Sequence, residues 1–207
     1  MAEETTKSLE EITQQQKALE EFKNKIKGKV IILYGASWIG KSLFALNLSK
    51  LFTFTKLYLI DNNYTQEYFN INPKIDIVKI ETPKQLDYSL TKETIAEDKL
   101  IIIDSITTLQ TAFIRDEYFS ARAYNEFNNF ADRIARKLSN LTPKTTSIII
   151  AHEKIRDWKT AEVIPRVNYT MLRNADMLIR IYRDGEKRKV KIVDYRHVPK
   201  KIEFEIE

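Results

Sequence analysis

The sequence predicts an α/β fold, with a mostly parallel central β-sheet flanked by helices and an antiparallel β-hairpin near the C-terminal end. Three observations predict it. Short apolar runs alternate with helical segments between residues 29 and 151, which is typical of a parallel sheet covered on both faces. A glycine-containing turn joins the first apolar run to a helix. Asp184-Gly185 separates two β-prone segments, as in a two-residue hairpin.

The N-terminal segment is expected to form a helix over residues 5–27. Ser8 and Glu11 have the spacing of a capping box, apolar residues recur at helical intervals, and Gly28 is the expected stop. We therefore expect residues 1–28 to be a helical extension and residues 29–207 to be the core domain. The apolar stripe of this helix packs on the core, docks a partner, or pairs with a second copy.

The core alternates strands and helices in chain order. Helices are expected from the glycine-containing turn through Leu51, after Pro83, and over residues 120–141, where apolar residues share one face and Pro143 ends the segment. The apolar runs that we expect to be strands are Val30–Tyr34, Leu57–Asp61, Asp76–Ile80, Leu100–Asp104 and Ser147–Ala151.

The pattern changes after residue 152. Residues 153–175 show no clear period, and the expected strands that follow are Met177–Arg183, Lys189–Tyr195 and Ile202–Ile206. Residues 183–201 hold eight Lys or Arg against three Asp or Glu, an excess that equals the net charge of the whole chain, +5. This surface is either a solvated hairpin or a contact for a polyanion.

Composition excludes several classes of protein. The chain has 207 residues, of which 43% are hydrophobic and 30% charged, as expected for one domain with a full core. It has no Cys and two His, which excludes disulfides, thiolate zinc sites and His-rich metal sites. No apolar run reaches about 18 residues, and the first residues are polar and acidic, unlike a signal peptide. We expect no membrane contact and a cytoplasmic location.

One eight-residue segment matches the phosphate-binding pattern G-x-x-x-x-G-K-[ST] at every fixed position. Its glycines let successive N–H groups face phosphate oxygens, and the following helix adds the positive end of its dipole. Lys41 would bridge the β- and γ-phosphates of ATP, and Ser42 would bind Mg²⁺. Trp38 covers the phosphates, lies on the surface, or contacts a neighbouring subunit. The expected nucleotide site comprises Gly35, Ala36, Ser37, Trp38, Ile39, Gly40, Lys41 and Ser42.

A carboxylate is available as the second group for the metal. Asp104 ends the apolar run Leu100–Asp104, and open α/β sheets bind ligands at the carboxyl ends of their strands. Asp104 would hold Mg²⁺ through water, opposite Ser42. The sequence therefore predicts a Mg²⁺–ATP site.

Further motifs follow the phosphate loop in order: Asp104-Ser105 after four apolar residues, Arg122 with Asn125-Glu126-Phe127, Leu172–Asp176 and Ile192–Pro199. This ordered set resembles the RecA superfamily, most of all the archaeal RadA and RadB recombinases and their paralogs. The likeness covers residues 28–206 and implies a RecA-like P-loop fold. It also implies that basic residues of the tail reach the γ-phosphate on an adjacent subunit, with Lys187, Arg188, Lys189 and Arg196 as candidates.

The resemblance implies a catalytic Glu just after the second strand, at the position that holds Asn63. An amide orients water but accepts no proton, so we expect a weak Mg²⁺-dependent ATPase, with Glu67 or Asp61 as substitutes for the missing base. His152-Glu153 stands where the family has its Asn-Gln γ-phosphate sensor, as in phage RecA-like annealing ATPases. Glu153 swings away from the phosphate or binds Lys154. The catalytic candidates are Lys41, Asn63, Glu67 and Glu153.

Two segments correspond to the mobile loops with which RecA-like proteins bind single-stranded DNA, residues 110–121 and 153–174. Cations neutralise backbone phosphates, and aromatic side chains stack on bases. A loop that serves only subunit contacts is the alternative. The DNA-binding candidates are Arg115, Arg156, Trp158, Lys159 and Arg166.

Three functions follow from these observations. The main hypothesis is an ATP-binding RecA/RadA-like protein in DNA recombination or repair, which binds single-stranded DNA, modulates a recombinase, or does both. The second is a phage-type annealing ATPase of a virus or plasmid that works with a single-strand binding protein. The third is a non-catalytic ATP-binding regulator that does not touch DNA. Assembly into a homo-oligomer is compatible with each of them.

Overall fold

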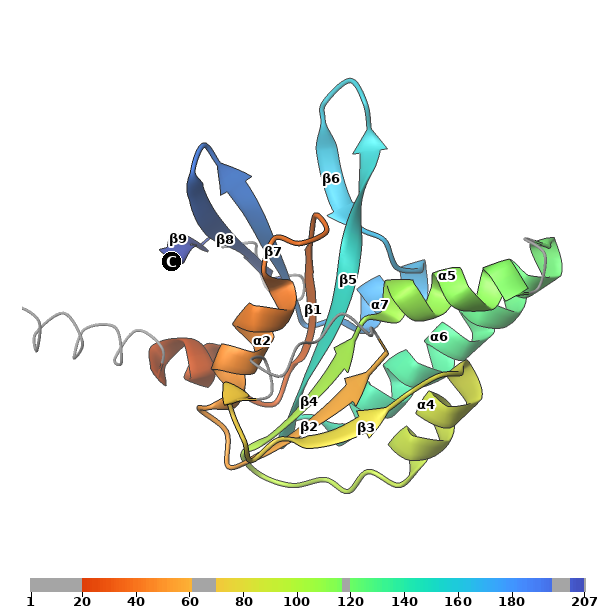
Figure 1. Ribbon diagram of the computed structural model, residues 1–207, viewed down its shortest axis with the longest axis horizontal. Helices are drawn as coiled ribbons and strands as arrows, with labels where there is room; N and C mark the ends of the chain where they lie inside the picture. The colour runs from red at the N-terminus through yellow and green to blue at the C-terminus, as the bar shows by residue number, and fades with distance from the viewer. Residues whose placement is uncertain (1–19, 61–69, 117–119, 195–201, 207) are drawn as a thin grey trace, which may run out of the picture.

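The structure is a computed structural model that describes residues 20–60, 70–116, 120–194 and 202–206 (Figure 1). Its strands form one sheet in the order β3-β2-β4-β5-β1-β7-β8-β9, with β6 paired to β5 alone. The strands are β1 (Val30–Gly35), β2 (Phe54–Leu59), β3 (Asp76–Lys79), β4 (Lys99–Asp104), β5 (Thr145–Asp157), β6 (Glu162–Pro165), β7 (Met177–Asp184), β8 (Lys187–Asp194) and β9 (Ile202–Ile206).

Strand direction follows the prediction. All pairings from β3 across to β7 are parallel, whereas β7 with β8 and β8 with β9 are antiparallel. The two-residue turn between β7 and β8 contains Gly185 at φ 63°, a conformation that glycine adopts without steric cost. The predicted α/β class, with a mostly parallel sheet and a C-terminal antiparallel hairpin, is confirmed.

Helices cover both faces of the sheet (Figure 1). Helices α4 to α7 pack on one face, over a core that includes Phe127 and Ile134. Helix α2 and the helical residues 20–26 pack on the other face, over a core that includes Ile31 and Ile102. The helices are α2 (Lys41–Ser49), α4 (Pro83–Thr91), α5 (Ile106–Asp116), α6 (Ala121–Leu141) and α7 (Tyr169–Asn174).

The described end of the N-terminal segment packs on the core. Phe22 and Ile26 are buried in the same cluster as α2. Gly28 follows with φ 67°, and a β-carbon there would lie 1.7 Å from the carbonyl oxygen of Pro143, so glycine is required at this close approach. Ser8 and Glu11, the expected capping box, lie outside the described residues.

The structure differs from the prediction mainly after residue 152. Strand β5 does not end at Ala151 but continues to Asp157, because its outer half pairs with β6 in an antiparallel hairpin that projects beyond the sheet (Figure 1). Helix α7 follows, capped by the Asn168 side chain, which accepts a hydrogen bond from the N–H of Met171. The expected loop at 153–174 is therefore a hairpin and a short helix.

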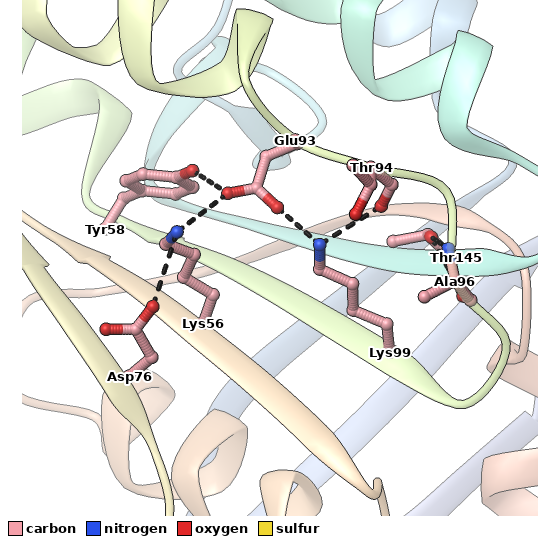
Figure 2. A network of polar contacts seen from close by, with 8 residues as sticks. All are labelled: Lys56, Tyr58, Asp76, Glu93, Thr94, Ala96, Lys99 and Thr145. Carbon is pink, nitrogen blue, oxygen red and sulfur yellow. Dashed lines mark hydrogen bonds and ion pairs between the residues drawn. The ribbon is translucent and has the colours of Figure 1, made fainter.

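A polar network joins β2, β3, β4 and the segment after α4 (Figure 2). The Glu93 carboxylate, whose side chain is 3% exposed, accepts hydrogen bonds from Tyr58, from Lys56 at 3.1 Å and from Lys99 at 2.5 Å. Lys56 also contacts Asp76 on β3 at 3.3 Å. The network ties β2, β3, β4 and the segment after α4 together at the edge of the sheet away from the phosphate loop.

Among the residues that the structure describes, no helix is long and apolar enough to cross a membrane.

Candidate functional site

The residues predicted for the nucleotide site meet at the carboxyl edge of the parallel strands. β1 ends at Gly35 and β4 ends at Asp104. β5 lies between these two strands and places His152 directly beside Gly35. Because three neighbouring strands bring polar groups to one edge, a ligand held there would touch several elements at once.

The turn from β1 into α2 is shaped by two glycines with different roles. Gly40 has φ 101° and is the N-cap of α2, and no side chain caps the helix. The N–H groups of the first turn of a helix have no partner within the helix, and an anion is one of the groups that can accept hydrogen bonds from them. A β-carbon on Gly35 would lie 2.3 Å from the carbonyl oxygen of Ile181 on β7. Gly35 is therefore needed for close packing of two backbones.

Lys41 holds its ammonium over the loop. Its side chain is buried, with a 6% exposed fraction, and Nζ donates to the carbonyl oxygens of Ala36 at 2.6 Å and Gly35 at 3.2 Å. Trp38, by contrast, has φ 63° and is 85% exposed, so it lies on the surface of the single chain. The loop thus presents one sheltered cation and one exposed aromatic ring.

Ser42 and Asp104 are brought together across the sheet. The Ser42 hydroxyl donates to Oδ2 of Asp104 at 2.5 Å, and Asp104 is 3% exposed. A hydroxyl and a carboxylate are the hard oxygen ligands that Mg²⁺ accepts, together with water and phosphate oxygens. The donor set therefore fits the expected metal. In the described part of the chain, this site included, no group of three or more His, Cys, Asp or Glu is placed to hold a metal ion.

His152 and Glu153 follow at the same edge but face different partners. Nδ1 of His152 lies 3.3 Å from the Ser37 hydroxyl, and its backbone N–H donates to Thr107 at 3.0 Å. One expectation was that Glu153 binds Lys154, but the structure pairs Glu153 with a different residue. Its carboxylate accepts a hydrogen bond from Nε of Arg180 on β7 at 3.0 Å.

Arg180 is the site residue that sequence reasoning missed. It lies beside Tyr34 in the β1–β7 pairing, and its side chain is 26% exposed. A half-buried guanidinium that holds a half-buried carboxylate lowers the cost of burying either charge. The only signal in the sequence was a basic residue, Arg180, among the apolar residues of β7. That signal does not indicate that Glu153 is its partner.

Two of the catalytic candidates, Asn63 and Glu67, lie outside the described residues, as does Asp61. Of the remaining two, Lys41 lies at the start of α2 and bonds to the loop carbonyls, and Glu153 lies on β5 and bonds to Arg180.

The DNA-binding candidates fall in two separate places. Arg115 does not lie in a loop but in the last turn of α5, which points away from the β5–β6 hairpin (Figure 1). Residues 110–116 remain helical because the amphipathic α5 packs its apolar side on the core. The other candidates lie on or just after the hairpin: Arg156, Trp158, Lys159 and Arg166.

The hairpin itself carries mixed charges. Arg156 pairs with Glu162 at 3.4 Å, and the backbone N–H of Lys159 donates to the Asp157 carboxylate at 2.8 Å. Trp158 at the turn is 82% exposed. Its most prominent feature for a ligand is therefore an exposed aromatic ring between one acidic residue, Asp157, and one basic residue, Lys159.

Comparison of the chain with models of known protein families, and with curated proteins, gave no match.

Proposed function

We propose that the protein binds Mg²⁺–ATP at Gly35–Ser42 and Asp104, that its fold is a RecA-like P-loop fold, and that it acts on DNA in recombination or repair. The observation that carries the nucleotide proposal is the Ser42–Asp104 contact of 2.5 Å beside the loop that Lys41 folds over. The sequence motif by itself predicts the roles of Ser42 and Lys41. The buried Asp104 carboxylate at the end of β4, which lies next to Ser42, adds support for a metal–triphosphate ligand.

The residues have clear roles toward such a ligand. Backbone N–H groups of the loop and of the first turn of α2 would hold the phosphates. Lys41 would exchange its bonds to the Gly35 and Ala36 carbonyls for bonds to phosphate oxygens. Ser42 and Asp104 would hold Mg²⁺, whose chemistry when bound is to neutralise negative charge on the β- and γ-phosphates.

Hydrolysis should be slow because Asn63 stands where the resemblance implies the base. A positioned general base contributes about 10²–10⁴-fold to a rate. Glu153 is a poor substitute, since Arg180 already engages its carboxylate at 3.0 Å. If Asn63→Glu raised turnover, the missing base would be the limiting feature. Equal turnover of both proteins would contradict that explanation.

The nucleotide proposal is tested by calorimetric titration of Mg²⁺–ATP into the unmodified chain and Lys41→Ala. We expect binding by the unmodified chain and a loss of about 10- to 100-fold or more for Lys41→Ala, because charge-assisted hydrogen bonds to phosphate are lost. Lys50→Ala is the matched control, since Lys50 is an exposed lysine at the other end of α2. Equal binding by Lys41→Ala and the control would refute the site.

The DNA proposal rests on the exposed Trp158 and on Arg156 and Lys159 in the same hairpin. Stacking of a base on an exposed aromatic ring is worth about 1–3 kcal/mol, and the hairpin projects beyond the sheet, where a strand of nucleic acid could reach it. Fluorescence anisotropy with labelled single-stranded DNA tests this. We expect salt-sensitive binding that depends on Mg²⁺–ATP and weakens in Trp158→Ala. ATP binding without any DNA binding would favour the regulator instead.

A further inference from the structure

The β7–β8 hairpin packs against the phosphate loop of its own chain. The carbonyl oxygen of Ile181 on β7 leaves no room for a side chain on Gly35. On β8, a guanidinium nitrogen of Arg188 would lie 3.2 Å from a β-carbon on Gly40. Arg188 therefore reaches the last residue of the loop before Lys41, from the side opposite to β5 in the strand order.

Arg188 differs from Arg180 and Lys189 on the same hairpin in having no counter-ion among the residues that the structure describes. Arg180 pairs with Glu153 at 3.0 Å, and Lys189 pairs with Asp184 at 2.6 Å. Arg188 is half-buried, yet within the described ranges no hydrogen bond or ion pair engages its guanidinium. A cation sheltered from water in this way gains most from an anion with several acceptor oxygens.

We propose that Arg188 binds the phosphate chain of a nucleotide held by the same protein chain. The inference rests on the proposed function and extends it, because the sequence left four basic residues unranked and directed them toward a neighbouring subunit. The structure puts Arg188 next to its own loop, so that Lys41 and Arg188 approach one ligand from two elements. A nucleotide would supply the missing counter-ion and fix the hairpin against α2.

The expected effect follows from the bonds that are lost. A guanidinium that donates two parallel bonds to phosphate makes a stronger and more directional contact than an ammonium. Arg188→Ala should weaken Mg²⁺–ATP binding about 10- to 100-fold. Arg188→Lys should recover part of the loss, since it keeps the charge and loses the fork. Arg183→Ala is the matched control, because Arg183 lies directly across from Arg188 in the same hairpin and is exposed.

Calorimetric titration with Mg²⁺–ATP of the unmodified chain, Lys41→Ala and the three hairpin variants tests the inference. Unchanged affinity in Arg188→Ala, alongside lost affinity in Lys41→Ala, would overturn the role of Arg188 and leave the nucleotide site standing. Equal binding by the unmodified chain and Lys41→Ala, or no binding by either, would overturn the proposed function as well. Melting temperatures measured on the same samples confirm that each variant is folded.

A mixing experiment separates action within one chain from action on a neighbour. If Arg188 served an adjacent subunit, an equimolar mixture of Lys41→Ala and Arg188→Ala would regain tight sites, since the first variant supplies Arg188 and the second supplies Lys41. Action within one chain predicts that the mixture binds no more tightly than Arg188→Ala alone. Recovery of high-affinity Mg²⁺–ATP binding in about a quarter to a half of the subunits would therefore contradict the inference.

Discussion

Gly35 and Gly40 occupy the two fixed glycine positions of one motif, but each is required by a different physical constraint. Gly40 has a positive φ of 101°, where an L side chain is strained. Gly35 is not among the residues with positive φ, and its constraint is the Ile181 carbonyl at 2.3 Å from any β-carbon. The motif therefore depends on β7, an element more than a hundred residues further along the chain.

Gly35→Ala tests this dependence. The methyl group would force β1 and β7 apart, and overpacking of this kind typically costs about 1–3 kcal/mol. We expect a lower free energy of unfolding in urea and weakened nucleotide binding in the same variant, since the loop leaves β1 at this residue. Gly185→Asn is a suitable control, because no atom lies within 4 Å of a β-carbon there and Asn tolerates its φ of 63°.

Elements with strong local signals could be predicted from the sequence. The apolar β1 and β4 and the 21-residue α6 lie where their patterns indicate, and the hairpin turn lies one residue further on than predicted, at Gly185-Glu186. Their formation depends on alternation, helical spacing and turn chemistry, which are properties of neighbouring residues.

The outer half of β5, strand β6 and helix α7 could not be predicted. Their stability comes from pairing between segments with mixed polarity, such as Lys154 opposite Ile164, which leaves no clear period. The position of Arg180 beside Glu153 and that of Arg188 beside Gly40 could not be predicted from the sequence either, because they depend on the order of the strands in the sheet. Ser42 and Asp104 could be predicted as a metal site because Ser42 belongs to a recognisable motif at the start of α2 and Asp104 ends the clearly apolar strand β4.

Because Glu93 is at the centre of the network that joins β2, β3 and β4, its loss should lower the free energy of unfolding. Burial alone would raise the pKa of Glu93, but hydrogen bonds from Lys99, Tyr58 and Lys56 outweigh it and hold the pKa below its usual value. Glu93→Gln removes the negative charge and leaves two ammonium groups without it. Breaking a buried pair costs about 3–5 kcal/mol, and partial exposure of both lysines reduces this to roughly 2–3 kcal/mol.

Urea unfolding of Glu93→Gln measures this cost. Glu81→Gln is the control, because Glu81 pairs with Lys79 at 3.8 Å on the surface, where such contacts contribute about 0–1 kcal/mol. Equal losses in the two variants would show that the network does not hold β2, β3 and β4 together.

At the scale of the whole molecule, two carboxylates join segments that are far apart in the sequence. Glu93, just after α4, contacts Lys56 and Tyr58 on β2 and Lys99 on β4. Asp98 binds Lys23 at 2.8 Å and accepts hydrogen bonds from Thr53 at 2.9 and 2.6 Å, and so joins the helical residues 20–26 to the segment before β2. Burial opposes ionisation of Asp98, but Lys23 and Thr53 outweigh it and lower its pKa to about 2.

These two shifts predict sensitivity to acid. A carboxylate with a depressed pKa stabilises the folded state fully above its unfolded value, and this contribution disappears as the pH falls through the folded value. The free energy of unfolding should therefore be steady above about pH 5 and should fall between about pH 5 and pH 2. Urea unfolding at a series of pH values should show a shallower fall for the double variant Asp98→Asn with Glu93→Gln, which has two fewer groups to protonate. Because the double variant already lacks both contacts at neutral pH, its curve should approach that of the unmodified chain in acid, and parallel curves at all pH values would contradict the assignment.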